Sequence, residues 1–414
     1  MTTPKRTTTI LLAAVLTTVL TACGSTVSGT GVPGEIDVRT LDVGSYPTEP
    51  VNAHDDDPVP AFYEMDTVAS MRIADHTIHA YDIDPQMIYG NRADANYARF
   101  LPAQLGDSPA MQAIAEKHKM LYGFHSSGAS KDISPNVSGS DWPSKKDDNR
   151  LTATTMVFQF PDAERATAAA REFHDTDFAT KEGRNQPVSL PKYPAAHAHW
   201  RPDSPFLRTV LPHGHYVIAF LLSVATPDLS ALTTLAESAY TKQIEALAKT
   251  TPLNDEQIMT LPWDPEHLLM RTLNPDELTM PDSTYFFVGG KQGAVHHSGG
   301  PLPDDRQYID QQLTKMNPQQ VAVSWGSIGI RTPDAETASR AVTDKLFPWR
   351  TETDVAPPPN LPDSACVENK RFAAKKRFSC IVAYHQYVGI VSSEQLLDAQ
   401  QRAAAQYALF ANSR

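Results

Sequence analysis

The feature that most constrains the fold is an internal repeat. Pro161-Asp162-Ala163-Glu164 recurs as Pro333-Asp334-Ala335-Glu336, and a strand-like apolar run precedes each copy. Farther along the chain, His215-Tyr216-Val217 matches Gln386-Tyr387-Val388 at nearly the same offset. Short patterns that return in the same order at a nearly constant offset are typical of duplicated structural units. We therefore expect two copies of one domain.

The repeated elements also predict the fold class. Alanines at helical spacing follow both Pro-Asp-Ala-Glu sequences, and proline at the first helical position followed by acids favours a helix start. A closing helix in each copy is marked by the equivalent residues Leu229, Leu232, Ala236 and Tyr240, and Leu396, Ala399, Ala403 and Tyr407. Each helix has one narrow apolar stripe, which needs a sheet to cover. The order strand, helix, strands, helix predicts an α+β fold with two tandem related domains, each an antiparallel sheet with helices packed on one face.

The domain boundaries follow from the end of the first closing helix. We place the first α+β domain at residues 59–250 and the second at residues 254–414. Residues 23–58 are rich in Gly, Ser, Pro and Asp, which is typical of a flexible tether. Within this tether, Leu41–Pro50 is apolar enough to dock, and we expect it to dock on the first domain.

The N-terminus predicts export. Lys5 and Arg6 precede a charge-free apolar run from Ile10 to Leu20, which is the pattern of a secretory signal peptide spanning residues 1–22. Leu20-Thr21-Ala22-Cys23 resembles a bacterial lipobox, in which the cysteine is lipidated and the chain is cut before it. The alternative is a plain signal peptide with a chance cysteine. The run is too short to span a bilayer as a helix, so we expect attachment to the outer face of the cell membrane through lipid on Cys23.

Charge excludes one class of partner. The formal net charge is −12, and loss of the signal peptide removes two cations. Nucleic acids require a basic surface, so we expect no nucleic-acid partner. Electrostatic attraction to anionic lipid is also excluded, which leaves acyl chains to hold the protein on the membrane.

Two further cysteines predict a disulfide. Cys366 and Cys380 remain as an even pair after Cys23 is assigned to the anchor. In an oxidising compartment, a structural disulfide is the expected state of such a pair. A redox-active pair is the alternative, but the close spacing of a Cys-x-x-Cys motif is missing.

Several of these motifs together resemble an uncharacterised family of two-domain actinobacterial lipoproteins. They are the lipobox, the Leu41–Pro50 segment with its Tyr-Pro-Thr, the paired Pro-Asp-Ala-Glu helices, and Asp264–Leu269 followed by Arg271-Thr272-Leu273. The resemblance covers essentially the whole mature chain and implies lipid anchorage, but it implies no reaction or catalytic residue. The helix-after-strand pattern with a late disulfide is also similar, at the level of fold alone, to the extracellular sensor domains of mycobacterial-type receptor kinases.

Motifs of common enzyme classes are missing. The sequence has no Gly-x-Ser-x-Gly elbow, no Walker loop and no His-Glu-x-x-His motif. Ser298 follows His296-His297 and could be a nucleophile beside a base, but the Gly-rich surroundings favour a surface turn. We therefore predict no catalytic residues and no cofactor.

Histidines supply the sharpest site hypothesis. His197 and His199 form one His-x-His unit, and His213 and His215 form another. On paired strands, alternate residues share a face, so four imidazoles could converge on zinc, copper or nickel. The alternative, which we favour, is a set of solvated histidines with the second unit at a hairpin turn. No carboxylate lies near enough in sequence to orient the rings.

The leading functional hypothesis is therefore a lipid-anchored extracytoplasmic binding or interaction protein. Tandem domains favour a ligand site between them, and the partner would be an envelope protein or a small-molecule ligand. The alternatives are a cell-envelope enzyme of unknown reaction and a metal-binding lipoprotein.

Overall fold

The computed structural model describes residues 36–50, 65–131, 149–180, 183–275, 286–298, 306–347, 353–369 and 377–413. The predicted signal peptide, Cys23 and much of the predicted tether lie outside these residues. Among the helices of the described ranges, none combines the length and the apolar character needed to cross a membrane.

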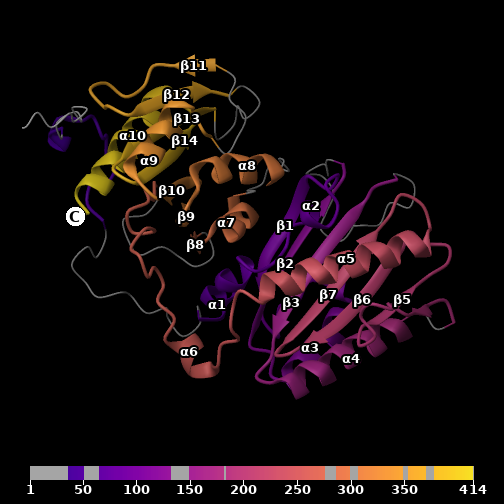
Figure 1. The fold of residues 1–414 in the computed structure, drawn as a ribbon. Coiled ribbons are helices and arrows are strands. Elements are labelled where there is room, and N and C mark those ends of the chain that lie inside the picture. Colours follow the sequence, from indigo (N-terminus) through magenta and orange to yellow (C-terminus); the bar gives the residue numbers. More distant parts are fainter. Residues whose placement is uncertain are drawn as a thin grey trace, which may run out of the picture. The chain divides into compact units, whose positions relative to one another are not determined.

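The first half of the chain forms a seven-stranded antiparallel sheet with the strand order β1-β2-β3-β7-β6-β5-β4 (Figure 1). Its strands are β1 (Tyr89–Asn96), β2 (Tyr122–Ala129), β3 (Thr152–Gln159), β4 (Gln186–Val188), β5 (His197–Trp200), β6 (Phe206–His213) and β7 (Tyr216–Ser223).

The second half repeats this topology. Its sheet has the order β11-β12-β13-β14-β10-β9-β8, again antiparallel throughout. The two orders are the same when the second sheet is followed from β8 to β11. Numbered within its own half, each sheet then has its strands in the order first, second, third, seventh, sixth, fifth, fourth. The strands are β8 (Phe286–Gly289), β9 (Gln320–Ser324), β10 (Ser327–Arg331), β11 (Thr353–Val355), β12 (Ser364–Glu368), β13 (Phe378–Tyr384) and β14 (Tyr387–Ser393).

The sequence repeat falls on equivalent elements. Asp162 caps α4 (Ala163–Ala179) and Asp334 caps α9 (Ala335–Thr343), each through a side-chain oxygen that accepts the amide of the third residue after it. The prolines therefore precede the cap, and the prediction that they occupy the first helical position is wrong. Tyr216 and Tyr387 begin β7 and β14. The closing helices are α5 (Leu229–Leu247) and α10 (Leu396–Ala411).

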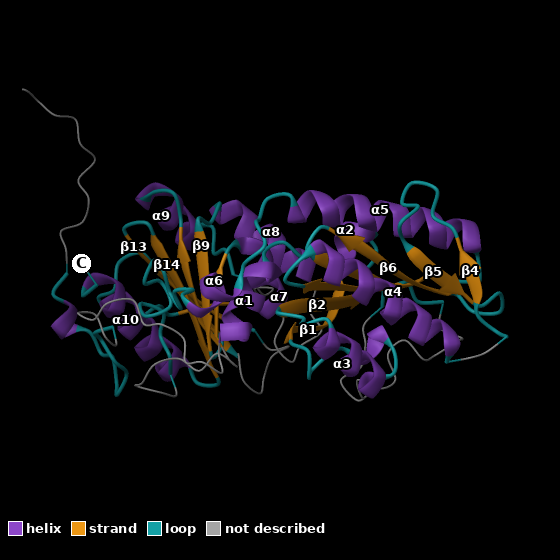
Figure 2. Cartoon of the chain, turned by 90° about the horizontal axis from the view of Figure 1, so that it is seen from below, coloured by secondary structure: helices purple, strands orange, loops and turns teal. Residues whose placement is uncertain are grey.

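The α+β class is confirmed, but the helices pack on both faces of each sheet instead of one. On β3, Val157 lies in a core cluster with Tyr240 of α5, whereas Met156 and Phe158 lie in another with α4. Figure 2 shows α5 on one side of the first sheet and α3 (Ser108–Lys117) and α4 on the other. In the second sheet, neighbouring positions of β14 likewise face α9 and α10. The reason is that β3 and β7 are buried at every position, so both faces need a cover.

The first helix contributes to the cores of both halves. In α1 (Met65–Ala74), Ile73 belongs to the core of the first sheet and Met71 to the core of the second. Asp75 accepts the amides of Gly290 and Gly293 at 2.6 and 2.7 Å, at the start of the helix α7. The side chains of α1 and Asp75 therefore connect the two halves of the chain. The remaining helices are α2 (Ala80–Ile83), α6 (Asp255–Met259), α7 (Lys291–Ser298), α8 (Arg306–Met316), η1 (Val38–Thr40) and η2 (Ala103–Leu105).

The described part of the predicted tether lies on the second half of the chain. The Tyr46 hydroxyl donates to Asp398 of α10 at 2.5 Å, and Asn412 donates to the carbonyl of Thr48 at 2.7 Å. The expectation that Leu41–Pro50 docks on the first domain is wrong, because its polar partners belong to α10.

The disulfide between Cys366 and Cys380 is confirmed. The two residues face each other on β12 and β13, with their α-carbons 4.1 Å apart. Both side chains are buried. The bond therefore joins neighbouring strands in the interior of the second half.

Removal of this disulfide should destabilise the protein. Closure of a loop of about 15 residues is worth roughly 3 kcal/mol in the chain-entropy model. We expect the double variant Cys366→Ala/Cys380→Ala to lose about this much unfolding free energy in urea titrations. Wild type reduced with dithiothreitol is the matched control and should approach the variant. Equal urea midpoints for oxidised wild type and the variant would contradict the expectation.

Candidate functional site

The structure keeps the two His-x-His units apart. Strands β5 and β6 pair as the metal hypothesis requires, but the register sets His197 opposite Val210 and His199 opposite Arg208. His213 instead pairs with Tyr216 at the turn between β6 and β7, where His215 also lies. Within the described ranges, no group of three or more His, Cys, Asp or Glu side chains has an arrangement that could hold a metal ion.

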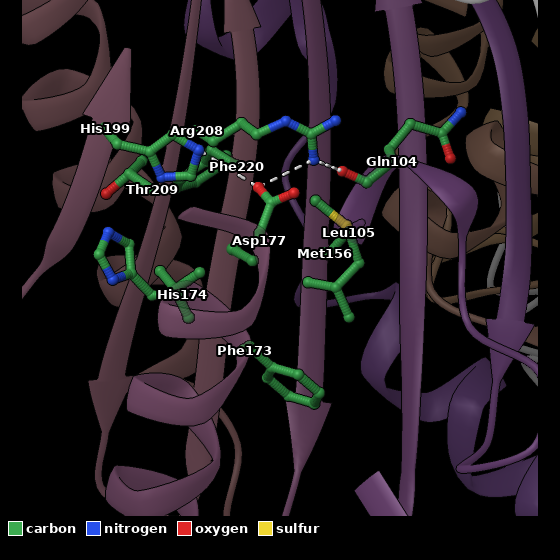
Figure 3. Close-up of a pocket in the computed structure, with 12 residues that line it drawn as sticks. Gln104, Leu105, Met156, Phe173, His174, Asp177, His199, Arg208, Thr209 and Phe220 are labelled. Carbon is green, nitrogen blue, oxygen red and sulfur yellow. Dashed lines mark hydrogen bonds and ion pairs between the residues drawn. The ribbon is translucent and has the colours of Figure 1, made fainter. Parts of the chain in front are cut away.

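His199 contributes to a small pocket beside α4 (Figure 3). Its Nε2 lies 3.4 Å from Oδ2 of Asp177, and Nη1 of Arg208 lies 3.4 Å from the same oxygen. Arg208 also donates to the carbonyl of Gln104 at 2.6 Å. The pocket contains about 270 Å³ of empty space, including open solvent at its mouth. Its other lining residues are Leu105, Met156, Phe173, His174, Thr209, Val210, Ala219 and Phe220.

Two imidazole nitrogens at this pocket are buried without a hydrogen-bond partner among the described residues. They are Nδ1 of His199 and Nε2 of His174. The opposite nitrogens face carboxylates, Asp177 at 3.4 Å and Asp175 at 3.2 Å, which assigns the ring protons to those sides. The two unpartnered nitrogens are therefore acceptors.

The rings lie close together, and their setting disfavours charge on His174. The His174 ring centroid is 5.3 Å from that of His199 and 5.5 Å from that of His197. Burial lowers the pKa of His174, and the neighbouring histidines lower it further, whereas Asp175 raises it. Neutral imidazoles can accept hydrogen bonds from a ligand, and His199 could also remove a proton from one.

Most residues of this site were not predicted from the sequence. Of its polar residues, only His199 and the nearby His197 were candidates. His174 and Asp177 stand three positions apart on a predicted helix, so they share a face. That spacing was the available signal, but nothing in the sequence linked this helix face to β5.

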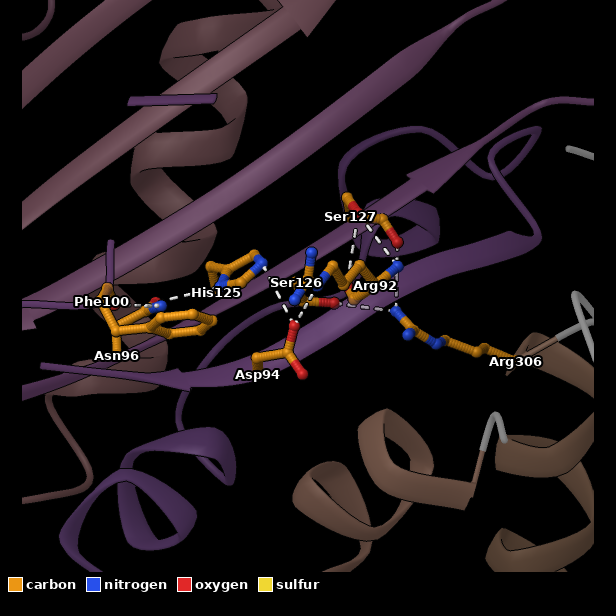
Figure 4. Close-up of polar contacts among 8 residues, drawn as sticks. All are labelled: Arg92, Asp94, Asn96, Phe100, His125, Ser126, Ser127 and Arg306. Carbon is orange, nitrogen blue, oxygen red and sulfur yellow. Dashed lines mark hydrogen bonds and ion pairs between the residues drawn. The ribbon is translucent and has the colours of Figure 1, made fainter. Parts of the chain in front are cut away.

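A second polar cluster lies where the first sheet meets α8 (Figure 4). Arg306 is only 4% exposed, and its Nη1 donates to Oγ of Ser126 at 2.9 Å and to the carbonyl of Ser127 at 3.2 Å. Gly90 of β1 makes room for it, because a Cβ there would lie 2.2 Å from Nε of Arg306. On the same strands, His125 contacts Asn96 at 3.0 Å. The hydrogen-bond partners of the guanidinium are thus neutral oxygens, and the charge of Asp94 nearby opposes the effect of burial on the Arg306 pKa.

His296 and His297 belong to this cluster, so their interpretation as a surface turn is wrong. Both lie in α7, and His296 is 2% exposed. Nε2 of His296 donates to the carbonyl of Thr77 at 2.8 Å, and the ring of His297 stacks on Phe287. The His296 ring centroid lies 3.7 Å from that of His79. Ser298 ends α7.

Burial keeps these histidines neutral. It lowers the pKa of His125 and of His297 to about 4, and the positive charge of Arg306 adds to the effect. The pKa values of His79 and His296 are well below the usual range for the same two reasons. Burial also lowers the pKa of Arg306 to about 10, so the guanidinium stays charged at neutral pH.

Comparison with known families matches both halves. Residues 57–263 match the N-terminal part, and residues 268–413 the C-terminal part, of a family described as a domain of unknown function (DUF7373). The chain belongs to the DUF7373 family. A search of curated proteins found no match to it. Each DUF7373 region contains one of the two seven-stranded sheets.

The histidines at the junction of the two DUF7373 regions should make the fold acid-sensitive. An unfolded histidine binds a proton near pH 6.5, whereas folded His125 and His297 bind one only near pH 4. The contribution of these two histidines to the unfolding free energy should therefore be fully present above pH 6.5. It should decrease as the pH drops toward 4 and change no further below that. Each of these two groups contributes at most roughly 3 kcal/mol to the fall. Urea titrations from pH 4 to 8 measure it.

Variants can assign this pH dependence to individual groups. His297→Phe should flatten the slope, because it removes one proton-binding group and retains an aromatic ring against Phe287. Phe287→Leu is the matched control, since it weakens packing without removing a titratable group. An unchanged slope in His297→Phe would refute the role of His297.

Proposed function

We propose that the mature chain is a lipid-anchored binding protein at the outer face of a bacterial cell membrane. The signal-like N-terminus followed by Cys23 supports export and lipidation. The buried disulfide is typical of proteins that fold in an oxidising compartment. Acyl chains would then hold an acidic protein that has no electrostatic attraction to anionic lipid.

The binding role is supported chiefly by one observation, the two unpartnered imidazole acceptors that line one pocket. Nδ1 of His199 and Nε2 of His174 require donors, because a buried polar atom without a partner costs free energy. A small ligand with hydroxyl or ammonium groups supplies such donors. Met156 and Phe173 on the same wall suit its carbon atoms. The pocket has room for about one water-sized group, so a single hydroxyl or ammonium group at the end of a larger molecule is what could enter it.

An enzyme in the cell envelope is the second candidate, and the Asp177–His199 pair favours it. A carboxylate on one imidazole nitrogen fixes the tautomer and leaves the other nitrogen able to act as a general base. In that case His199 would take a proton from water or from a substrate hydroxyl in the same pocket. The metal-binding alternative has no such observation behind it, because no group of three or more ligand side chains among the described residues is arranged to hold an ion.

The lipid anchor should depend on Cys23. In a bacterial host, Cys23→Ala should abolish incorporation of labelled fatty acid and release the protein from the membrane fraction, because the thiol is the site of acylation. Cys366→Ala/Cys380→Ala is the control and should keep its label, since those cysteines form the disulfide. Label retained in Cys23→Ala would refute the assignment.

The pocket should bind small hydrogen-bond donors. Glycerol and ethanolamine, titrated into ¹⁵N-histidine-labelled protein, should shift the imidazole resonances of His174 and His199. His199→Phe should weaken binding about tenfold, which corresponds to the loss of one hydrogen bond.

Controls separate the three candidates. His213→Asn alters a histidine at the β6–β7 turn and should bind like wild type. Tight one-to-one zinc binding that is lost in His199→Ala would favour the metal-binding alternative. If neither probe moves the two resonances, the pocket is not a donor-binding site.

A further inference from the structure

Residues 41–50 are fastened to α10 by several contacts. Tyr46 is the centre of the attachment: its hydroxyl donates to Asp398 at 2.5 Å and accepts from Nε of Arg402 at 3.0 Å. The Arg402 guanidinium also lies over the Tyr46 ring, 5.3 Å from its centroid. Gln401 donates to Asp42 at 3.0 Å. The Tyr46 side chain thus contacts both Asp398 and Arg402 of α10.

The backbone and the apolar residues of the segment fit the same surface. Gly44 has φ +57°, and a Cβ there would lie 2.8 Å from the Gln401 side chain, so this position needs glycine. Asn412 donates to the carbonyl of Thr48, and Leu41 is 8% exposed. Contacts therefore run from Asp42 to Thr48, to the first half of α10 and to Asn412 just after its end.

Docking on α10 fixes a point of the chain that is close in sequence to Cys23. From Cys23 to Asp37, where the compact part of the chain begins, the sequence advances about 14 residues, which span at most about 50 Å when fully extended. The next described element after this segment is α1, which begins at Met65. Counted from Met65 instead of Asp37, the chain back to Cys23 is about three times as long, with a maximum reach near 150 Å.

We infer that Leu41–Pro50 is a strap that ties the lipid anchor to α10 and holds the C-terminal half beside the lipid surface. The inference rests on the proposed lipidation of Cys23. The strap contacts the second half of the chain through α10, so it acts on that half directly. The partner is the bilayer surface, reached through the acyl chains, which agrees with the absence of a basic surface charge in the sequence.

Energy transfer from the protein to the membrane tests the strap. A donor dye on Leu397→Cys, at an exposed position of α10, and an acceptor on lipid headgroups report the distance in vesicles that carry the full lipidated chain. We expect strong transfer in the parent and a clear loss in Tyr46→Ala. A chain three times as long spreads about 1.7-fold farther on average.

Matched variants make the outcome specific. Tyr46→Phe removes only the hydroxyl bonds to Asp398 and Arg402, and should give an intermediate loss. Thr48→Ala retains the backbone carbonyl that Asn412 contacts, and should behave like the parent. Hydrogen exchange at residues 41–48 should rise in Tyr46→Ala and stay unchanged in Thr48→Ala.

The failures are distinguishable. Unchanged transfer in Tyr46→Ala, with fatty-acid label on Cys23 intact and exchange at residues 41–48 increased, overturns the strap and leaves lipid anchorage standing. A parent protein without label on Cys23 overturns both the strap and the proposed anchorage.

Discussion

The arrangement of this protein depends on α1, a helix that must fit two cores at once. Ile73 packs in the core of the first sheet, Met71 in that of the second, and Asp75 just beyond accepts amides at the start of α7. Those amides have no partner within their own helix, so a carboxylate there satisfies the donors and the helix dipole together. Burial raises the pKa of Asp75, and the two amide hydrogen bonds oppose that rise. The glycines are required because a Cβ at position 293 would lie 2.8 Å from the Asp75 carboxylate. The two halves are therefore joined through polar groups that are buried only when α1 and α7 meet.

The sequence repeat predicted the fold well because its motifs coincide with element boundaries. Aspartate caps begin α4 and α9, and tyrosines begin β7 and β14, so the matched residues fall on equivalent positions. The prediction that helices cover one face of each sheet was wrong because it considered the apolar stripes of the helices and not the burial of the strands. Strand β7 is buried at every position, and an uninterrupted apolar strand is typical of a sheet covered on both sides. The docking of Leu41–Pro50 was misplaced for a different reason. Its partners on α10 are hundreds of positions away in sequence, and no local pattern identifies them.

The candidate site shows a similar limit. Pairing of β5 with β6 was a condition of the metal hypothesis and is present, but the register of an antiparallel pair depends on turn length and on which face is buried. That register placed His199 beside Arg208 and not beside His213. The carboxylate beside His199 belongs to Asp177 of α4, a helix that the sequence predicted only as a cover for the sheet. His296 was misread because the Ser298-Gly299-Gly300 sequence after it resembles a turn, whereas His296 lies in α7 and its ring donates to the carbonyl of Thr77. The local composition therefore predicted an exposed turn, whereas contacts with residues far away in sequence bury His296.

The two polar clusters handle charge in different ways. In the pocket, Asp177 lies between Arg208 and His199, so opposite charges meet within one group of side chains. At the junction, Arg306 has neutral oxygens from Ser126 and Ser127 as hydrogen-bond partners, and a buried cation of this kind is costly. Burial already disfavours protonation of His79, His125, His296 and His297, and the field of Arg306 disfavours it further. The junction therefore contains four neutral imidazoles near one buried guanidinium, and the opposing charge of Asp94 favours protonation of His125 and His297. This arrangement lets the His79 and His296 rings lie close together, because neutral imidazoles with centroids 3.7 Å apart do not repel one another as imidazolium ions would.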